Sequence, residues 1–406
     1  MQKFEKHSPV VVTEVTTKHE LRQFMQYPNR LYADNPNYIP SFYGDDLSDW
    51  TPGKNPAFDY CEARCWLARR DGEIVGRIGA ILSHKANDKF GTHRMRFSQV
   101  DFVDDSEVSA ALFGTVERWA REKGCDQVHG PLGFTDMDRE GMLVEGFDRR
   151  SLFFTNYNAP YYLEHLTRLG YRKDVDWIEY RITVPEPGGA EAERLHKLSE
   201  FILKRKHLHV ATVHHKSEYG PFVRQVFELV NAAYAPLYGV VELSDEQIER
   251  YANKFIPLVD PDFVCFVVDE QEKLVAFGVT ALDPSVALKH SDGRLFPFGW
   301  AGVLNDLHHS DTLIMLLTAV RPDLQAEGIN AVMMDHVCQS CNRHGVRFAE
   351  TGPMLELNDH ILAQWKRLEK EQHKRRRCFI KDLDYDVNAA NAAAAQTETP
   401  ETESAE

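Results

Sequence analysis

Apolar residues in the first part of the chain follow two spacings, which predict strands and helices in alternation. Short apolar runs bounded by turn residues predict strands, and apolar residues three to four positions apart predict helices. Strands are expected at 65–70, 74–82, 96–103 and 126–130, with Asp71-Gly72 as the turn between the first two. Helices are expected at 18–25, 106–123 and 161–171.

The second part of the chain repeats this order. Strands are expected at 263–268, 274–280, 313–320, 346–350 and 378–383, and helices at 219–234, 244–255, 331–344 and 358–371. The turn-rich stretch Val184-Pro-Glu-Pro-Gly-Gly189 lies between the two series. The pattern predicts an α/β protein with mixed sheets, made of two related domains at 1–184 and 185–387. The low-complexity tail at 388–406 is expected to be disordered.

Composition narrows the class of protein. The chain has 406 residues, of which 43% are hydrophobic and 27% charged, the balance of a globular protein. The net charge of -15 disfavours a nucleic-acid partner. Seven scattered cysteines indicate reduced thiols, and no apolar run approaches the ~18 residues of a membrane span. We therefore expect a cytoplasmic protein without integral membrane association, and a homo-oligomer stays possible.

The junction between an apolar strand and a helix predicts an anion site. The strand ends at Val320, a loop Gln325-x-x-Gly328-x-Asn330 follows, and the next helix begins at once. A helix start offers free N–H groups and about half a positive charge. Neither a Walker loop nor a Gly-x-Gly-x-x-Gly loop is present.

This loop resembles the Arg/Gln-x-x-Gly-x-Gly/Ala loop with which GNAT acyl-CoA N-acyltransferases hold the pyrophosphate of coenzyme A. Gln325 and Gly328 match its first two positions, and Asn330 departs from the third. The GNAT pattern of a late helix starting near Asn is matched by Asn358 in the second half. In the first half Asn158 and the helix end Leu-Gly-Tyr171 match it, so that the resemblance spans residues 10 to 385.

The resemblance implies two tandem GNAT-like domains, with acyl-CoA (acetyl-CoA) as the cosubstrate of the second. The first is expected to be a degenerate copy, because its corresponding segment 101–106 lacks glycine and has three acids that would repel a pyrophosphate. The cofactor-binding residues implied are Thr318, Val320, Gln325, Ala326, Glu327, Gly328, Ile329, Asn330 and Asn358.

The implied activity is transfer of an acetyl or other acyl group to an amine. A main-chain N–H of the strand around 317–320 would bind the oxyanion in such a reaction. GNAT enzymes usually protonate the thiolate with a tyrosine on the late helix, but Trp365 stands there and an indole supplies no proton. Candidate bases are Glu356, the first choice, and Glu350, beside the bend after the fifth strand; a glutamate in such a place more often caps the following helix or pairs with an arginine.

A Gly-rich insertion at 130–147 is the candidate acceptor side, because long irregular segments inside compact domains are often functional. Asp136, Glu140 and Glu145 could hold an ammonium group, with Tyr157 as a further substrate contact; a purely structural loop is the alternative. Aromatic residues elsewhere leave open a longer acyl chain or a lipid-like amine: Tyr161, Tyr162, Phe296, Phe298 and Trp300.

The sequence also offers one alternative site and one alternative function. Cys338-x-x-Cys341 with His336 and His344 has the spacing of metal ligands, but the same residues match a buried helix face, so no metal is expected. A non-catalytic GNAT-fold protein that binds coenzyme A or a partner is the alternative function, favoured by Trp365 and Asn330. The sequence leaves the acceptor, the acyl length and the oligomeric state open.

Overall fold

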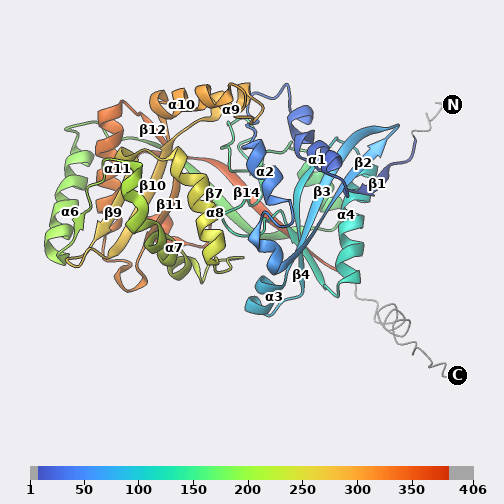
Figure 1. Ribbon diagram of the computed structural model, residues 1–406, viewed down its shortest axis with the longest axis horizontal. Helices are drawn as coiled ribbons and strands as arrows, with labels where there is room; N and C mark the ends of the chain where they lie inside the picture. The colour runs from blue at the N-terminus through green and yellow to red at the C-terminus, as the bar shows by residue number, and fades with distance from the viewer. Residues whose placement is uncertain (1–7, 384–406) are drawn as a thin grey trace.

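A computed structural model describes residues 8–383 and shows one mixed sheet running through this part of the chain, with helices on both faces (Figure 1). The strands in sheet order are β1 (Val11–Glu14), β2 (Cys61–Arg70), β3 (Glu73–Ser83), β4 (Arg94–Phe102), β5 (Gln127–Gly130), β14 (Lys370–Asp382), β7 (Arg172–Thr183), β12 (Phe348–Glu350), β11 (Thr312–Val320), β10 (Leu274–Leu282), β9 (Val264–Val268) and β8 (His209–Val210). Off this path, β6 (Met142–Glu145) pairs with β14 and β13 (Met354–Leu355) pairs with β7. The predicted mixed-sheet α/β class is confirmed.

Each half contains one parallel strand pair joined by a helix. Helix α4 (Ser106–Glu122) connects β4 to the parallel β5, and α11 (Asn330–His344) connects β11 to the parallel β12. A parallel pair needs such a crossover, whereas the neighbouring antiparallel strands need only short turns. The same unit therefore occurs in the first half (residues 8–184) and the second half (185–383).

The last strands of the two halves are exchanged. β7 ends the first half, yet it pairs with β12 and β13 of the second half. β14 ends the second half, yet it pairs with β5 and β6 of the first. The two exchanged strands also pair with each other along the middle of the molecule, where Figure 1 shows them side by side. Each half therefore supplies the strand that completes the sheet of the other.

Helix α4 shows how local sequence sets an element of the first half. The Asp105 side chain caps it by accepting from the Glu107 and Val108 amides, and Gly124 follows its end with φ of +74°. Its buried face packs on the sheet in a core that includes Val108, Leu112, Val116 and Ala120. The other helices of this half are α1 (Lys18–Leu31), α2 (Tyr43–Asp49), α3 (His84–Phe90) and α5 (Tyr162–Arg168).

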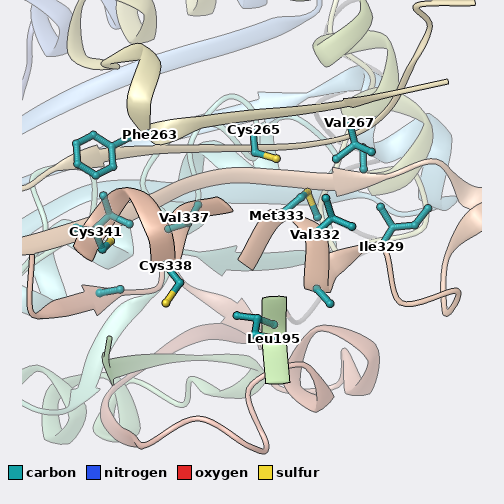
Figure 2. Packing of buried hydrophobic residues seen from close by; sticks show 14 of the residues in the cluster. Leu195, Phe263, Cys265, Val267, Ile329, Val332, Met333, Val337, Cys338 and Cys341 are labelled. Atoms are coloured by element: carbon teal, nitrogen blue, oxygen red, sulfur yellow. The ribbon is translucent and has the colours of Figure 1, made fainter. Parts of the chain in front are cut away.

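In the second half, alternation along β9 builds a core on each face of the sheet. Cys265 and Val267 point to the face covered by α6 (Ala190–Lys206) and α11, where Figure 2 shows Leu195 of α6 facing Cys338 of α11. Val264, Phe266 and Val268 point to the opposite face, covered by α7 (Gly220–Tyr234) and α8 (Asp245–Phe255). The remaining helices are α9 (Ser285–His290), α10 (Gly299–His309) and α12 (Asp359–Ala363).

One predicted helix is wrong. Residues 358–371 form only the short α12, and β14 already begins at Lys370 opposite Ile182 of β7. Pairing of β14 with β7 outweighs the helical preference of the local sequence. The elements that the sequence did not predict are helices α2, α3, α6, α9 and α10 and strands β1, β6, β7, β8 and β13. The low-complexity tail lies outside the described residues, and none of the described helices is long and apolar enough to cross a membrane.

Candidate functional site

A cleft opens where β11 and β12 part. The two strands pair only at 312–314 and 348–350. After that, β11 continues along β10, and the segment that follows β12 turns away and pairs with β7 as β13. The cleft has a volume of about 170 Å³, more than ten times the space that one water needs. Its lining is mainly apolar and includes Met315, Leu316, Thr318, Met333, Gly352 and Trp365.

A β-bulge lies at the centre of the cleft wall. Val279 of β10 is opposite Leu317, and the next residue, Thr280, is opposite Met315, so Leu316 has no partner on β10. A bulge turns main-chain N–H and C=O groups out of the ladder. The cleft wall therefore offers main-chain hydrogen-bonding groups on the strand that the sequence assigned to the oxyanion.

The start of α11 lies at one end of β11 and has free donors. Gly328 has a φ of +83°, and a Cβ atom there would come within 3.0 Å of Ile202 Cδ1. Within residues 8–383, the amides of Gly328, Ile329 and Asn330 donate to no protein acceptor. Free amides and a helix dipole at one place favour the binding of an anion, so the predicted anion site stays a prediction at this helix start.

Basic residues of α6 lie against this loop. Lys206, in the last turn of α6, pairs with Glu327 at 2.7 Å. The Lys206 hydrogen bond and charge, together with Arg205, lower the pKa of Glu327. The unpredicted helix α6 therefore adds positive charge beside the predicted anion site. An anion bound there would compete with Glu327 for Lys206.

The other predicted cofactor residues lie at different places around the cleft. Thr318 and Asn330 line it, and Gln325 Nε2 donates back to the Val320 carbonyl at 3.3 Å. Asn358 caps α12 by accepting from the Ile361 amide at 3.3 Å and is not among the residues that line the cleft. Of the nine predicted cofactor residues only Thr318 and Asn330 thus line the cleft; Val320, Gln325, Ala326, Glu327, Gly328 and Ile329 lie outside its lining, and Asn358 serves the local helix.

The two predicted bases are held in ion pairs with β14. Glu350 is buried, with Lys374 Nζ at 3.3 Å and Arg181 at 3.5 Å. Glu356 pairs with Arg375 at 3.0 Å and also with Lys173. Neither glutamate is among the residues that line the cleft. Each would have to leave a salt bridge before it could take a proton from an amine.

The cleft has a hydroxyl that sequence analysis did not assign. Trp365 is buried in the cleft wall, where its Nε1 donates to Met354 Sδ at 3.2 Å. Tyr234, at the end of α7, also lines the cleft and donates to the Thr318 carbonyl at 2.8 Å. Burial, and to a smaller extent the Asp136 charge, raise the pKa of Tyr234 to about 12. Its hydroxyl therefore keeps its proton at neutral pH.

The Gly-rich insertion of the first half reaches this site. Met137 packs in a cluster that includes Leu316 and Leu317 of β11. Burial raises the pKa of its neighbour Asp136 to about 6, and burial also raises the pKa of Glu140 well above its usual range. Asp136 lies near enough to the cleft residue Tyr234 for its charge to act on that hydroxyl, but neither Asp136 nor Glu140 is among the residues that line the cleft.

Two other predicted acceptor residues lie elsewhere. Tyr157 packs against Tyr32 and Tyr38, and its hydroxyl accepts from Asn35 Nδ2 at 2.6 Å. The third acid, Glu145, is on β6 and contacts Arg375 at 3.4 Å. Tyr157 thus belongs to the core of the first half, and Glu145 to the contact of that half with β14.

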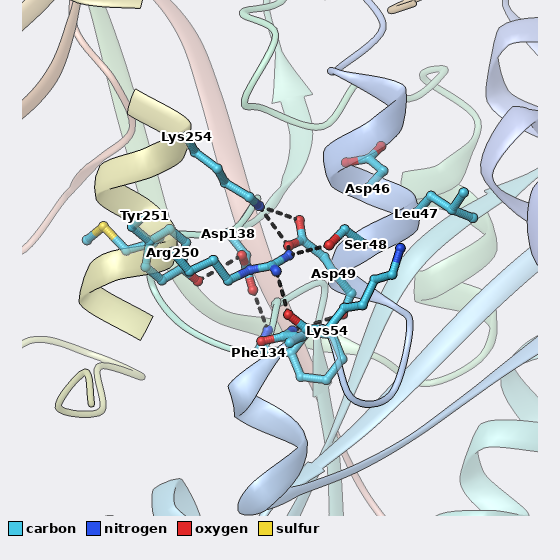
Figure 3. A network of polar contacts seen from close by, with 12 residues as sticks. Asp46, Leu47, Ser48, Asp49, Lys54, Phe134, Asp138, Arg250, Tyr251 and Lys254 are labelled. Atoms are coloured by element: carbon cyan, nitrogen blue, oxygen red, sulfur yellow. Dashed lines mark hydrogen bonds and ion pairs between the residues drawn. The ribbon is translucent and has the colours of Figure 1, made fainter. Parts of the chain in front are cut away.

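A second cavity, the interhalf pocket, lies between α2, the insertion and α8. Its lining includes Phe42, Asp49, Asp138, Phe153, Phe154, Lys254 and Leu258. Figure 3 shows the polar network at its edge, where Asp49 pairs with Arg250 at 2.5 Å and Lys254 at 2.7 Å, and Asp138 accepts from Tyr251 at 3.3 Å. The Phe154 ring lies 3.6 Å from a Cβ built on Gly352, a cleft residue, so the two cavities approach each other at Phe154.

One group of potential metal ligands occurs in the described residues. Ligand atoms of His129, Asp174 and Cys378 lie within 4.8 Å of one another. The Tyr238 hydroxyl donates to Asp174 at 2.5 Å and lies 3.0 Å from His129 Nδ1. Burial and the nearby Arg96 lower the pKa of His129 to about 4. The Tyr238 hydroxyl thus already bonds to two members of this group, and the positive charge of Arg96 acts on His129, where a cation would have to bind.

The chain is similar to two curated bacterial proteins. It is 27% identical over 379 residues to Protein YghO of Escherichia coli, covering 92% of this chain and 95% of the relative. It is 28% identical over 300 residues to a bacterial ceramide synthase of Caulobacter vibrioides, covering 72% and 75%. No family model matches the chain.

Solved structures identify the fold. A tandem GNAT protein from the clavulanic acid biosynthesis pathway matches with a TM-score of 0.52 at 14% identity, covering 92% of this chain and 98% of that one. A GCN5-related glucosamine N-acetyltransferase region of a fungal GH3 β-N-acetylglucosaminidase has the same TM-score at 11% identity, covering 92% of this chain and 38% of that one. The chain therefore has the tandem GNAT fold that its sequence resembles.

Proposed function

We propose that this tandem GNAT-fold protein is an acyl-CoA-dependent N-acyltransferase with its cosubstrate in the cleft between β11 and β12. The observation that supports this most directly is the bulge at Leu316 in a strand that leads to the free amides of Gly328, Ile329 and Asn330. In this proposal the main-chain donors for the oxyanion and for the pyrophosphate would follow one another along β11 and the loop after it.

The length of that path suits coenzyme A. From Val320 to Leu316 the strand rises about 13 Å at ~3.3 Å per residue, which gives an extended arm a wall to follow. The pyrophosphate would lie at the α11 start with Lys206 beside it. The thioester would lie at the bulge, between Met333 and the acceptor side.

The acceptor side supplies groups for both proton transfers. The amine nitrogen attacks the thioester carbonyl carbon, the C–S bond breaks, and the acyl group forms an amide. Asp136, with its pKa raised to about 6 by burial, would take the proton that the amine loses. Tyr234 would protonate the leaving thiolate from its position against Thr318.

A lipid-like amine is the acceptor class that we propose. The cleft and the neighbouring interhalf pocket contain long apolar side chains, among them Met333, Phe153 and Leu258. One relative is named a ceramide synthase, and a ceramide is an N-acylated long-chain amine. An apolar route with carboxylates near its reactive end would suit such a molecule.

A non-catalytic role is the second candidate. Trp365 in place of a tyrosine, and the ion pairs of Glu350 and Glu356, favour a protein that binds coenzyme A without transferring its acyl group. The two candidates agree on cosubstrate binding and differ on turnover.

Release of free coenzyme A thiol from acetyl-, decanoyl- and palmitoyl-CoA, with a long-chain 2-amino alcohol as acceptor, tests the proposal. Asp136→Asn and Tyr234→Phe should each lower turnover at least about a hundredfold and leave coenzyme A affinity, measured by calorimetry, within twofold. Tyr219→Phe is the matched control, because Tyr219 is a buried tyrosine directly before α7 whose hydroxyl contacts only Val259 O among the described atoms, at 3.4 Å.

Three results are informative. Thiol release that depends on the acceptor amine supports the enzyme. Tight coenzyme A binding without thiol release from any of the tested donors supports the non-catalytic role. An absence of calorimetric heat at millimolar coenzyme A contradicts both.

A further inference from the structure

Aromatic side chains are exposed in the loop between α9 and α10 and at the start of α10. Phe296 is 80% exposed, Phe298 is 81% exposed and Trp300 is 48% exposed. Val286 of α9 and Leu304 of α10, two helices that pack on each other, are each about half exposed. We call these five residues the aromatic ridge. Large apolar side chains exposed close together along the chain are typical of an interaction site.

The backbone beneath the ridge is firmly held. The Gly293 carbonyl accepts from the Tyr43 amide at 3.0 Å, and the Trp300 amide donates to the Leu295 carbonyl at 2.8 Å. A Cβ atom on Gly299 would lie 1.9 Å from the Arg294 carbonyl oxygen, so this turn is closely packed. The fold therefore fixes the rings in an outward position that water alone would disfavour.

The ridge borders the entrance of a large cavity. Leu295 and Phe296 line a cavity of about 980 Å³ whose other walls come from α2 and α8. Phe42 and Leu258 line both this cavity and the interhalf pocket. The interhalf pocket in turn approaches the cleft at Phe154. Neighbouring cavities, whose walls combine apolar side chains with charged ones such as Asp45 and Lys254, thus lie between the ridge and the proposed site of acyl transfer.

We propose that the aromatic ridge docks into the surface of a lipid bilayer, from which the acceptor amine passes into the cavity behind Phe296. The inference rests on the proposed function and adds the place where its substrate is collected. Trp and Phe at the rim of an apolar patch are the side chains that favour the membrane–water interface. A second copy of the chain seated on the ridge would instead close the cavity entrance.

The charges near the ridge balance, so that binding to a bilayer should not depend on anionic lipid. Between residues 286 and 309 the cations Lys289 and Arg294 are balanced by Asp292 and Asp306, and the whole chain has a net charge of -15. Attraction to anionic lipid therefore contributes little, and insertion of apolar side chains provides the binding free energy. Binding to phosphatidylcholine vesicles should change less than about twofold between 50 and 300 mM salt.

Flotation of the full chain with phosphatidylcholine vesicles tests the docking. The triple variant Phe296→Ser, Phe298→Ser, Trp300→Ser should lower vesicle partitioning at least about tenfold. Phe201→Ser is the matched control, since Phe201 is a 57% exposed phenylalanine on α6, far from the ridge in sequence, and it should float like the unaltered chain. Circular dichroism and coenzyme A calorimetry on each variant verify that the fold and the cleft are intact.

The outcomes separate this inference from the proposed function. Failure of the unaltered chain to float, or equal flotation of the triple variant, overturns the docking even if acyl transfer is observed. A dimer in light scattering that the triple variant converts to monomer overturns it in favour of a second copy. Flotation that needs the ridge upholds the docking, whereas absence of thiol release in the same preparations counts only against the enzyme.

Discussion

At the scale of single residues, the two glycines at the ends of α11 have the same backbone requirement and different surroundings. Gly328 and Gly345 have φ of +83° and +70°. A side chain on Gly328 would meet Ile202 and stand before the free amides, whereas a side chain on Gly345 would meet open space. The same substitution at both sites therefore separates backbone strain from loss of the anion site.

Gly328→Glu should weaken coenzyme A binding at least about tenfold, because it adds bulk and negative charge where the pyrophosphate would lie. Calorimetry measures the affinity. Both substitutions should lower the melting temperature, because both place a side chain at a positive φ. Gly345→Glu should leave the affinity for coenzyme A unchanged. If both variants bind coenzyme A equally well, the site lies elsewhere.

Deprotonation of Asp136 should lower the stability of the fold and raise the proposed activity, so that the two depend on pH in opposite directions. Its folded pKa of about 6 lies above the ~4 of an unfolded aspartate, so the folded state binds the proton more tightly. Stability therefore falls as pH rises from about 4 to about 6, and above that range the buried carboxylate costs on the order of 1–3 kcal/mol.

Asp136→Asn should accordingly stabilise the protein at pH 8 by on the order of 1 kcal/mol or more, and the gain should vanish near pH 4. Urea unfolding at the two pH values measures it. In the unaltered enzyme, kcat/KM should fall as pH drops below about 6, since the base becomes protonated. A stability gain that is the same at pH 4 and pH 8 would contradict the assignment of the pKa shift to this carboxylate.

The sequence predicts those site residues whose role depends on neighbours in the chain. The loop from Gln325 to Asn330 is a candidate from the sequence alone because a strand, a glycine and a helix start are adjacent. Tyr234 was missed because its partner Thr318 is 84 residues away. The salt bridge of Glu350 was likewise beyond prediction, because Lys374 reaches it only through the pairing of β14 with β7.

At the scale of elements, β7 and β14 are joined by buried charges. Glu179 contacts Arg376 at 2.5 Å and Lys374 at 3.2 Å, and all three side chains are fully buried. Burial alone would raise the pKa of Glu179, but Arg376 and Lys374 lower it to about 2. This carboxylate therefore stabilises the fold above the unfolded pKa of ~4.3, and the stabilisation is lost as pH falls towards 2.

Glu179→Gln should lower the free energy of unfolding at pH 7 by about 3 kcal/mol, because it leaves buried cations without a counter-charge. Glu371→Gln is the matched control on β14. Glu371 is exposed in its pair with Arg149, so its loss should cost less than about 1 kcal/mol. Urea denaturation compares the two variants. Equal losses of the free energy of unfolding would mean that the buried ion pairs stabilise the protein no more than the exposed pair does.

Elements were predictable where local and tertiary preferences agree. Helix α4 has a cap, a periodic apolar face and a glycine stop in its own sequence. Residues 358–371 have helical composition as well, but the strand that begins at Lys370 gains its partners from β7 and so ends the helix early.

At the scale of the whole molecule, the strand exchange makes the halves depend on each other. The first half alone would lack β14 beside β5, and would expose both sides of β7. Unpaired strand edges of this length favour aggregation over folding. The sequence repeat revealed two similar units, but not this exchange, because the order of elements does not determine which strands pair.

A fragment of residues 8–184 should therefore fail to give a folded, soluble domain, and the same fragment with residues 370–382 joined by a flexible linker should recover sheet signal in circular dichroism. The intact chain should unfold in one calorimetric transition. Two separate transitions, or a folded 8–184 fragment, would show that the proposed division at 184 separates independent domains.

The position of β14 also has a consequence for how the protein is made. Phe379 pairs with Gly130, so the register of β5 is completed by residues synthesised about 250 positions later. On the ribosome, the first half emerges early and must wait, with an open sheet edge, until the last strand leaves the exit tunnel. Folding is therefore expected to finish only after release of the chain, and holding chaperones should matter more for this protein than for one whose domains close in order.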